Sequence, residues 1–408
     1  MRVLLLNNLP APYFTPLFAR LGELLEGKLT VCYSSDWNQT VGWESDSTDS
    51  GRGQAIILDR RAPKLRRWFG SGVAAAVALL KVLRTDKPEF VLCYGYTLLP
   101  QFVLLLWALA TRTPFALSGD ANFYNDAPKG LKGIGRTFWL RLVVGRAAAL
   151  ICVGTANRMF WQKYGARPEQ LFLAGFAVDN AALVSASDKF RNPFFSYTKE
   201  HEENTKKGKQ IFDSLRESSC DFVDEKFPDD KTIFLFVGRL VERKNVRLIL
   251  QAARRLDAER FAIVIAGSGE QLEELKSLAA DQANVHFLGN VAPADLPAVY
   301  AMADVLVLPA RDEPWGLVIN EAMACGLAIV AHEHCGAAVD LVAEDNGFRL
   351  SGFSVEELAA AMNQLIHDQG LLDSMKEASR QKIQDWTIEN AANGIIEAIA
   401  SSGRLRKI

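Results

Sequence analysis

Paired cysteines are absent from this 408-residue sequence: none of its six cysteines forms a Cys-x-x-Cys pair. Most of the six lie in apolar stretches, which is typical of buried, reduced thiols in a cytoplasmic protein. Long apolar runs are absent too. The amino-terminal apolar run is too short for a signal sequence, and the longest apolar stretch, residues 102–110, is too short to span a bilayer. We therefore expect a cytoplasmic location.

Typical metal-binding patterns are also missing. The sequence has no Asp-x-Asp triplet, and its five histidines all lie after residue 200. The sequence His332-Glu333-His334 resembles a ligand cluster. However, alternate residues of a strand share a face, so Glu333 would point away from the two histidines, and no third histidine accompanies them. We expect neither a metal nor another cofactor.

Charge is unevenly distributed along the chain, although the net charge is only −2. Residues 1–185 carry 21 Lys and Arg against 13 Asp and Glu, whereas the remainder carries 25 against 35. A basic amino-terminal half suggests an anionic partner, such as a lipid surface or a phosphorylated acceptor. A drift in composition would give the same numbers. We expect no nucleic-acid partner.

One segment of this basic half combines cations with aromatic residues. Five cations precede two aromatic residues there: Arg60, Arg61, Lys64, Arg66 and Arg67, then Trp68 and Phe69. Basic and aromatic residues together suit the interface of an anionic membrane. The segment therefore predicts peripheral membrane contact, with a solvated loop beside a buried helix as the alternative.

Short apolar runs alternate with segments of helical spacing through most of the chain, for example helical spacing over residues 73–83, 98–110 and 135–144. The strand-like runs are residues 3–6, 29–33, 55–58, 90–94, 115–118, 150–153 and 171–173, then 233–237, 262–266, 285–288, 305–308, 328–331 and 348–350. Such a β-α-β alternation predicts an α/β protein with parallel, doubly wound, Rossmann-like sheets.

The alternation is interrupted over residues 185–230, which are mostly polar and charged. We therefore predict an amino-terminal domain over residues 1–184, a linker with a charged helical segment over 185–230, and a second domain over 231–385. The two domains would face each other across a cleft. A final helix within 386–408 is expected to pack back on the amino-terminal domain.

Two patterns in the second domain indicate a ligand site. Gly238 follows the predicted strand 233–237, and Arg239 and Lys244 come next, where two cations at a helix start would suit a diphosphate. Further on, Glu313 and Glu321 stand eight positions apart, the first after strand 305–308 and the second in a predicted helix. Because ligands bind outside the carboxyl ends of parallel strands, both acids could reach the hydroxyls of a nucleotide sugar. Solvated surface charges are the alternative for both pairs.

Residues 232–350 resemble the donor half of a family 4 (group 1) glycosyltransferase, a family with the GT-B fold. The segments that carry the resemblance are 237–240 with Lys244, 266–269, 285–289, the Glu313 to Glu321 element with its continuation to Gly326, 335–342, and Asn346-Gly347. The resemblance implies transfer of a sugar from a nucleotide-sugar donor, with retention of the anomeric configuration and without a metal.

By position, the resemblance also implies roles for single residues. Arg239 and Lys244 would hold the diphosphate, Glu313 would contact the transferred sugar, and Glu321 would accept hydrogen bonds from the ribose. The other residues that it places on the donor side are Gly238, Gly267, Leu288, Gly316, Leu317 and Val318.

The amino-terminal half departs from the family pattern. Where the family usually has a glycine-rich loop after the first strand, this chain has Asn7-Asn8-Leu9-Pro10. Where many relatives have a histidine after the strand at 115–118, it has Asp120, shortly after Ser118. We expect Asn7, Asn8, Ser118 and Asp120 on the acceptor side, with Asp120 also catalytic. A carboxylate accepts hydrogen bonds but cannot donate one, and a capping or turn acid is the alternative for Asp120.

The predicted function is that of a retaining glycosyltransferase. It would move a sugar from a UDP- or GDP-sugar to a glycan or lipid-linked acceptor, in polysaccharide, lipopolysaccharide or glycolipid biosynthesis. Two alternatives remain, a catalytically inactive nucleotide-sugar-binding module and a GT-B sugar-nucleotide epimerase.

Overall fold

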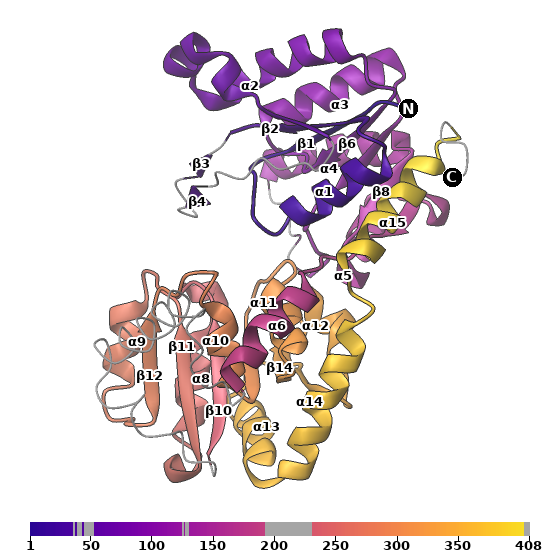
Figure 1. Ribbon diagram of the computed structural model, residues 1–408. Helices are drawn as coiled ribbons and strands as arrows, with labels where there is room; N and C mark the ends of the chain where they lie inside the picture. Colours follow the sequence, from indigo (N-terminus) through magenta and orange to yellow (C-terminus); the bar gives the residue numbers. More distant parts are fainter. Residues whose placement is uncertain are drawn as a thin grey trace, which may run out of the picture. The chain divides into compact units, whose positions relative to one another are not determined.

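A computed structural model describes residues 1–35, 37–38, 43–44, 53–124, 126, 130–191 and 231–403 of the chain (Figure 1). It divides into two compact units. Unit 1 comprises Met1–Val178 together with Trp386–Ile408, and unit 2 comprises Asp179–Asp385. Each unit has its own parallel sheet, so each can be described by itself.

Unit 1 is built on a seven-stranded parallel sheet with the order β5-β2-β1-β6-β7-β8-β9. The strands are β1 (Val3–Asn7), β2 (Leu29–Tyr33), β5 (Gln54–Ile57), β6 (Phe90–Tyr94), β7 (Phe115–Ser118), β8 (Ala149–Cys152) and β9 (Leu171–Leu173). Strands β1, β6, β7 and β8 are buried along their whole length, as expected for parallel strands with helices on both faces. A short antiparallel pair, β3 (Trp37–Asn38) and β4 (Trp43–Glu44), lies outside this sheet.

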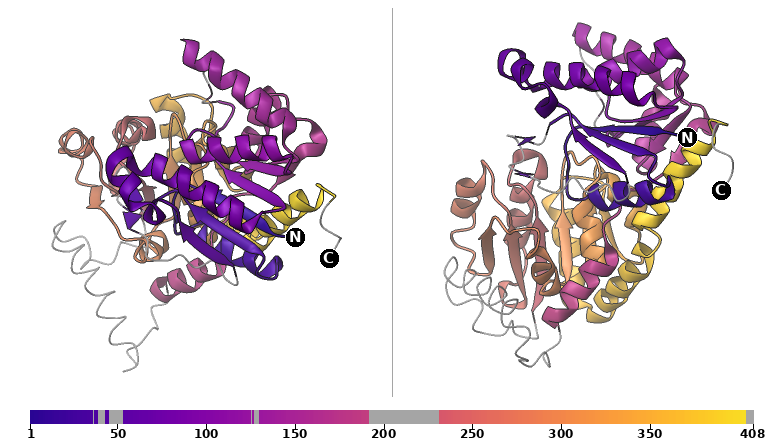
Figure 2. Two further views of the ribbon diagram at one scale, coloured as in Figure 1. Left: turned by 90° about the horizontal axis from the view of Figure 1, so that it is seen from above. Right: turned by 45° about the horizontal axis from the view of Figure 1, so that its top comes forward.

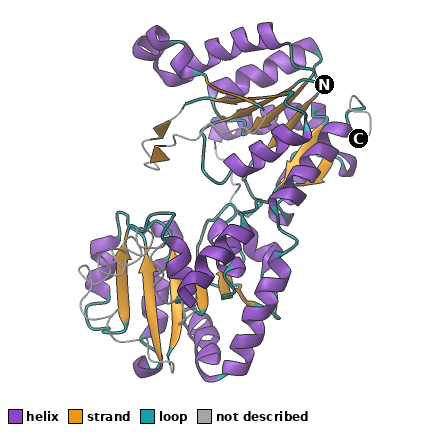
Figure 3. Ribbon diagram, in the orientation of Figure 1, coloured by secondary structure: helices purple, strands orange, loops and turns teal. Residues whose placement is uncertain are grey.

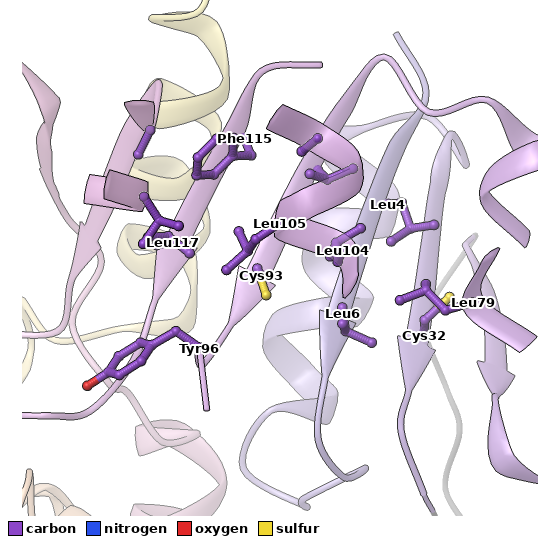
Figure 4. Packing of buried hydrophobic residues seen from close by; sticks show 14 of the residues in the cluster. Leu4, Leu6, Cys32, Leu79, Cys93, Tyr96, Leu104, Leu105, Phe115 and Leu117 are labelled. Atoms are coloured by element: carbon purple, nitrogen blue, oxygen red, sulfur yellow. The ribbon is translucent and has the colours of Figure 1, made fainter. Parts of the chain in front are cut away.

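Alternating side chains of these strands form two cores, one on each face of the sheet. One face carries Leu4 and Leu6 and meets helices α2 (Pro63–Asp86), α3 (Leu99–Thr111), α4 (Gly130–Arg146) and α5 (Thr155–Lys163). Figure 4 shows part of this cluster, including Leu79 of α2 and Leu104 of α3. The other face carries Val3 and Leu5 and meets α1 (Thr15–Leu24) and α15 (Ile388–Ala400). The last helix of the chain therefore completes the core of the first unit, and Figure 1 shows it (yellow) beside α1.

Unit 2 is built on a six-stranded parallel sheet with the order β12-β11-β10-β13-β14-β15. The strands are β10 (Thr232–Val237), β11 (Phe261–Ala266), β12 (Val285–Gly289), β13 (Val305–Leu308), β14 (Ala328–His332) and β15 (Gly347–Leu350). Helices flank this sheet, as Figure 3 shows. They are α6 (Asn180–Arg191), α8 (Val246–Ala253), α9 (Leu272–Leu278), α10 (Leu296–Ala301), α11 (Leu317–Ala324), α12 (Gly336–Leu341), α13 (Val355–His367) and α14 (Gln369–Ile383).

The predicted strands and the α/β class are confirmed, but one boundary is wrong. The sequence placed residues 180–184 in the amino-terminal domain and began the linker at 185, whereas residues 180–191 form the single helix α6. This helix packs on α10 and α11, so it belongs to unit 2. The rest of the predicted linker, residues 192–230, lies outside the described residues, as do residues 404–408.

Helix α2 is longer than the predicted helical segment 73–83. Its length matters because no segment of the sequence was expected to be long enough to span a bilayer. Among the described residues it is the one helix long and apolar enough to cross a membrane, a test that core helices of soluble proteins also pass. Its inner side, with Ala75, Leu79 and Leu83, is part of the core of unit 1. Helix α2 therefore lies against the sheet.

Candidate functional site

The predicted donor residues gather at one point of the sheet of unit 2. Strand order reverses between β10 and β13, because the chain adds β11 and β12 on one side of β10 and β13 to β15 on the other. Open α/β sheets bind ligands outside the carboxyl ends of the strands at such a switch point. The loops that leave β10 and β13 there carry Lys244 and Glu313.

The loops after β10 and β11 approach so closely that Gly267 and Gly269 have no room for side chains. A Cβ atom added at Gly267 would overlap the carbonyl oxygen of Gly238, and one added at Gly269 would overlap that of Leu240. Gly238 and Gly267 have φ of 149° and 148°, which residues with side chains rarely adopt. The loops are also joined by a hydrogen bond from the Leu240 amide to the Ser268 carbonyl at 2.8 Å.

The amides of these glycines are used within the protein. The Gly238 amide donates to the Ala266 carbonyl at 3.0 Å, and the Gly267 amide donates to the Gly289 carbonyl at 2.6 Å. These glycines shape the floor of the site by letting two loops meet.

Lys244 and Glu313 form an ion pair across the switch point. Their side chains are only 10% and 12% exposed, so the pair is screened by little water. The Lys244 ammonium would also lie 3.8 Å from a Cβ at Gly238, which places it over the glycine turn. Lys244 ends a short 3-10 turn, Glu242–Lys244, and helix α8 starts at Val246, so Lys244 flanks the start of a helix.

Arg243 extends this charged cluster, and the sequence gave it no role. Its guanidinium lies 3.7 Å from the Glu313 carboxylate and donates to the Asp312 carbonyl at 2.7 Å. Asn245 completes the attachment with a hydrogen bond to the Pro309 carbonyl at 3.3 Å. The loop after β10 is therefore fastened to the loop after β13, which fixes Lys244 against Glu313.

The loop after Glu313 turns sharply into α11. Gly316 has a φ of 96° and caps the helix, so α11 begins at Leu317. A Cβ at Gly316 would lie 3.2 Å from the Glu313 side chain and 3.1 Å from the Cys335 sulfur. Leu317 and Val318 form the start of α11, shortly after Glu313 in the chain. The first amides of a helix have no hydrogen-bond partner within the helix.

Glu321 is held by a tyrosine that the sequence did not single out. The hydroxyl of Tyr300, on α10, donates to a Glu321 carboxylate oxygen at 2.5 Å. Burial raises the pKa of Glu321, and the hydrogen bond from Tyr300 acts in the opposite direction. Burial also raises the pKa of the Tyr300 phenol, which is completely buried. No local pattern links the two residues, because they come from different helices.

The remaining donor-side residues are more open. Arg239 is exposed in the loop after β10. Leu288 is half-buried near the end of β12, next to the bulge between β11 and β12. Both lie at the carboxyl edge of the sheet of unit 2.

The histidine pair in unit 2 has another arrangement than the sequence predicted. Strand β14 ends at His332, so His334 lies beyond the strand and the strand-face argument does not apply to it. The His334 amide donates to Nδ1 of His332 at 3.0 Å, and the His332 ring stacks on Phe353 with centroids 3.8 Å apart. Burial lowers the pKa of His332 to about 4. No cluster of three or more metal-ligating side chains occurs within the described residues.

The predicted acceptor-side residues lie at the carboxyl edge of the sheet of unit 1. Asn7 ends β1, is buried, and accepts a hydrogen bond from the Asn8 amide at 2.8 Å, which shapes the turn. Ser118 ends β7 and is also buried. Asp120 is exposed, and its charge helps to raise the pKa of Tyr13 to about 12, although burial of Tyr13 contributes more.

The loop that carries Asp120 is positioned by a buried asparagine outside the predicted set. Asn157, on α5, donates to the carbonyls of Gly119 and Ala121 at 2.9 and 2.6 Å. Its carbonyl oxygen accepts from the Val153 amide at 3.2 Å and from the Trp161 indole at 3.1 Å. The side chain thus uses its whole hydrogen-bonding capacity, and the two bonds that it donates hold the loop after β7.

This geometry can be compared with known proteins. Residues 219–382 match the family model described as "Glycosyl transferases group 1". This matched segment, which makes up less than half of the chain, resembles the group 1 glycosyl transferases. The matched segment covers both the Gly238 loop and the Glu313 to Glu321 element, so the switch-point site lies within the family domain.

Two curated relatives are each similar to part of the chain. The D-inositol 3-phosphate glycosyltransferase of Rhodococcus jostii is 31% identical over 180 residues, which is 41% of this chain and 40% of that protein. A GDP-mannose-dependent alpha-(1-6)-phosphatidylinositol monomannoside mannosyltransferase of Mycobacterium tuberculosis is 35% identical over 159 residues, 36% of this chain and 41% of that protein. The chain thus matches about two fifths of the length of these relatives.

Solved structures match the whole chain. Anabaena Alr3699/HepE in complex with UDP and glucose has a TM-score of 0.68 at 17% identity, covering 98% of this chain and all of that one. WaaG, a glycosyltransferase involved in lipopolysaccharide biosynthesis, has a TM-score of 0.62 at 15% identity and covers 98% of this chain and all of that one. At these identities the likeness establishes the fold, and the predicted GT-B fold with two parallel-sheet α/β units is confirmed.

Proposed function

We propose that the protein transfers a sugar from a UDP- or GDP-sugar to a glycan or lipid-linked acceptor, with retention of configuration and without a metal. The observation that carries the proposal is the Lys244–Glu313 pair at the strand-order switch of unit 2, in a group 1 glycosyl transferase domain. Similar proteins support a nucleotide-sugar donor: one relative is named as GDP-mannose-dependent, and a protein of the same fold was solved with UDP and glucose.

The leaving nucleoside diphosphate requires positive charge in a fixed position. Lys244 is held between the Gly238 turn and Glu313, and Arg239 extends from the same loop. Charge that is already oriented stabilises a developing phosphate anion without further reorganisation. In our proposal a diphosphate takes over part of the ammonium's contacts, and Glu313 then accepts a hydrogen bond from a hydroxyl of the transferred sugar.

In the proposed transfer step the two substrates exchange bonds and a proton, and no protein side chain has to take up the acceptor proton. The bond between the anomeric carbon and the diphosphate oxygen breaks, and the acceptor oxygen bonds to that carbon from the same face. The acceptor proton passes to the departing phosphate oxygen. Glu321, oriented by Tyr300, would accept hydrogen bonds from the ribose, and Asn7, Asn8, Ser118 and Asp120 would contact the acceptor.

Donor binding is the first test. Thermal unfolding in a panel of UDP- and GDP-sugars should reveal one nucleotide that stabilises the protein. Lys244→Ala should weaken binding of that nucleotide by about 10- to 100-fold, the worth of one charge-assisted hydrogen bond. Lys276→Ala is the matched control, since Lys276 is a half-exposed cation of the same unit, 49% exposed, and should bind like the parent. Equal nucleotide affinity in Lys244→Ala and the control would remove the basis of the proposal.

Catalysis, stereochemistry and metal dependence are then tested with the selected donor. Mass detection with lipid-phosphate and soluble glycan acceptors should give a product larger by one sugar, and NMR of its anomeric proton should show the donor's configuration. Activity should survive a metal chelator. Donor binding with neither transfer nor slow donor hydrolysis would favour the inactive binding module, and a changed sugar on an intact nucleotide would favour the epimerase.

A further inference from the structure

Helix α3 contains no charged residue, yet part of its surface faces solvent. Its inner side, including Leu104 and Leu105, is buried in the core of unit 1. Leu99, Phe102 and Leu106 lie on one outer stripe and are 45%, 39% and 44% exposed. A helix that is apolar all round is normally covered on every side. The outer stripe of α3 therefore calls for a partner.

The exposed apolar surface continues onto the neighbouring helix α4. The rings of Phe102 and Trp139 lie 4.3 Å apart, so α3 and α4 are in contact. Ile134 and Phe138 stand one turn apart on α4 and are 67% and 72% exposed. Single exposed apolar residues are ordinary, but contiguous exposed apolar surface on several helices marks an interaction site.

Helix α2 packs on the other side of α3 and adds two strongly exposed aromatic residues (Figures 1 and 2). Trp68 and Phe69 are 78% and 68% exposed. They end the first segment of α2, because Gly70, with a φ of 83°, interrupts the helix directly after them. The part of α2 beyond Gly70 is packed on the sheet, so the leading segment presents its two rings to solvent.

The charged residues of α2 and α4 are almost all basic, and α3 has none. Helix α2 contains five Lys or Arg and one acid, Asp86, and α4 contains four Lys or Arg and no acid. Arg136 is committed to an ion pair with Asp126 at 2.6 Å. Cations such as Lys64, Arg67 and Lys132 are exposed. We name the exposed apolar residues of α2, α3 and α4, with the cations of α2 and α4, the apolar-basic face.

We infer that the apolar-basic face docks on the surface of an anionic lipid bilayer. Apolar and aromatic side chains can enter the headgroup region, while surrounding cations attract anionic headgroups. A second copy of the chain fits less well, because it would bring two sets of cations together. The face would hold unit 1 beside the membrane, where a lipid-linked acceptor is found. The inference uses no residue of the proposed donor site.

The direct test is flotation or sedimentation of the full chain with vesicles. The protein should bind vesicles of phosphatidylglycerol in phosphatidylcholine, bind pure phosphatidylcholine far less, and dissociate as salt rises. Lys64→Ala combined with Arg67→Ala should weaken binding by about 30-fold, because each surface cation is worth about fivefold. Trp68→Ser combined with Phe69→Ser should weaken it by more than about tenfold, since both rings lose apolar burial.

A matched control separates this face from apolar surface in general. Phe190→Ser replaces a 44% exposed phenylalanine on α6 of unit 2 and should leave vesicle binding unchanged. Nucleotide binding by the Trp68/Phe69 double variant should equal that of the parent, which verifies folding and keeps this test separate from the donor site. Absence of vesicle binding at low salt overturns the inference. The inference is also overturned if both double variants bind vesicles as well as the parent does. It is overturned as well if the variants abolish self-association of the chain but leave vesicle binding unchanged.

Discussion

Tyr300→Phe removes one oxygen atom from the buried support of Glu321. Hydrogen bonds to charged groups contribute about 1.5–3 kcal/mol, and here the donor is a fully buried hydroxyl 2.5 Å from the carboxylate. We expect the variant to lose that much unfolding free energy at neutral pH. For a unit of this size, the melting temperature should fall by about 3–10 °C. A carboxylate that is no longer fixed in one rotamer should also bind the donor ribose about 2- to 10-fold more weakly.

The effect should depend on pH in a defined direction. Burial raises the pKa of Glu321 above its ordinary value, so the folded state holds that proton more tightly than the unfolded state. Stability is then lost as the pH rises through the folded pKa, where the buried charge must form. Phenylalanine removes an effect that lowers this pKa, so the variant's pKa is higher. The difference in stability between variant and parent should be full above the variant's pKa. It should narrow as the pH falls from the variant's pKa to the parent's pKa, both of which lie above the ordinary value of 4.5.

Thermal unfolding across pH and nucleotide titration measure both effects. Tyr33→Phe is the matched control, since Tyr33 is a fully buried tyrosine whose hydroxyl has no hydrogen-bond partner in the described part of the chain. Removing that hydroxyl should leave stability within about 0.5 kcal/mol of the parent or raise it. The reasoning is refuted if the two variants melt alike at neutral pH, or if the Tyr300→Phe gap does not narrow in acid.

Two further predictions concern the loops of the two units. Gly267→Ala should cost more than about 3 kcal/mol of unfolding free energy and lower nucleotide affinity, because the new Cβ overlaps the Gly238 carbonyl and φ is positive. The control is Gly72→Ala, at a helical glycine with open space around it, which should be neutral or stabilising by up to about 1 kcal/mol. Equal melting temperatures for Gly267→Ala and Gly72→Ala would contradict the loop geometry. Asn157→Ala should cost about 3 kcal/mol because it leaves the buried groups of the Asp120 loop unpaired. Urea unfolding measures this loss of stability. The control is Asn363→Ala, at an exposed asparagine, which should stay within about 0.5 kcal/mol of the parent. The same urea midpoint for both variants would argue against the role of Asn157.

The sheets were predictable because parallel strands buried on both faces leave an unmistakable pattern. Strands β2, β6, β7, β9 and β13 have the predicted bounds, and the other main strands differ by a residue at one or both ends. Each is a short apolar run between polar segments, and burial on both faces admits few polar residues. The turn at Gly316 and the start of α11 were predictable for a similar reason, since a glycine before an apolar helical pattern ends the preceding loop.

Side-chain partners were not predictable, because they depend on which elements meet in space. Tyr300 precedes Glu321 by 21 residues and lies on another helix. Asn157 reaches a loop that lies 36 to 38 residues earlier in the chain. Nothing local distinguishes these residues from other buried polar side chains. The same holds for Gly267, whose backbone conformation follows from the path of the neighbouring loop.

The membership of α15 in unit 1 has a consequence for synthesis of the chain. Unit 2 is one continuous stretch, so it can fold as soon as its last strand and helices leave the ribosome. Unit 1 must wait until α15 has been made, since Ile395 and Ile399 cover its sheet and Gly394 lies directly on the backbone of Leu173. A nascent chain would meanwhile expose an uncovered apolar sheet that chaperones could bind, and a premature stop codon before α15 would harm the unit that was made first.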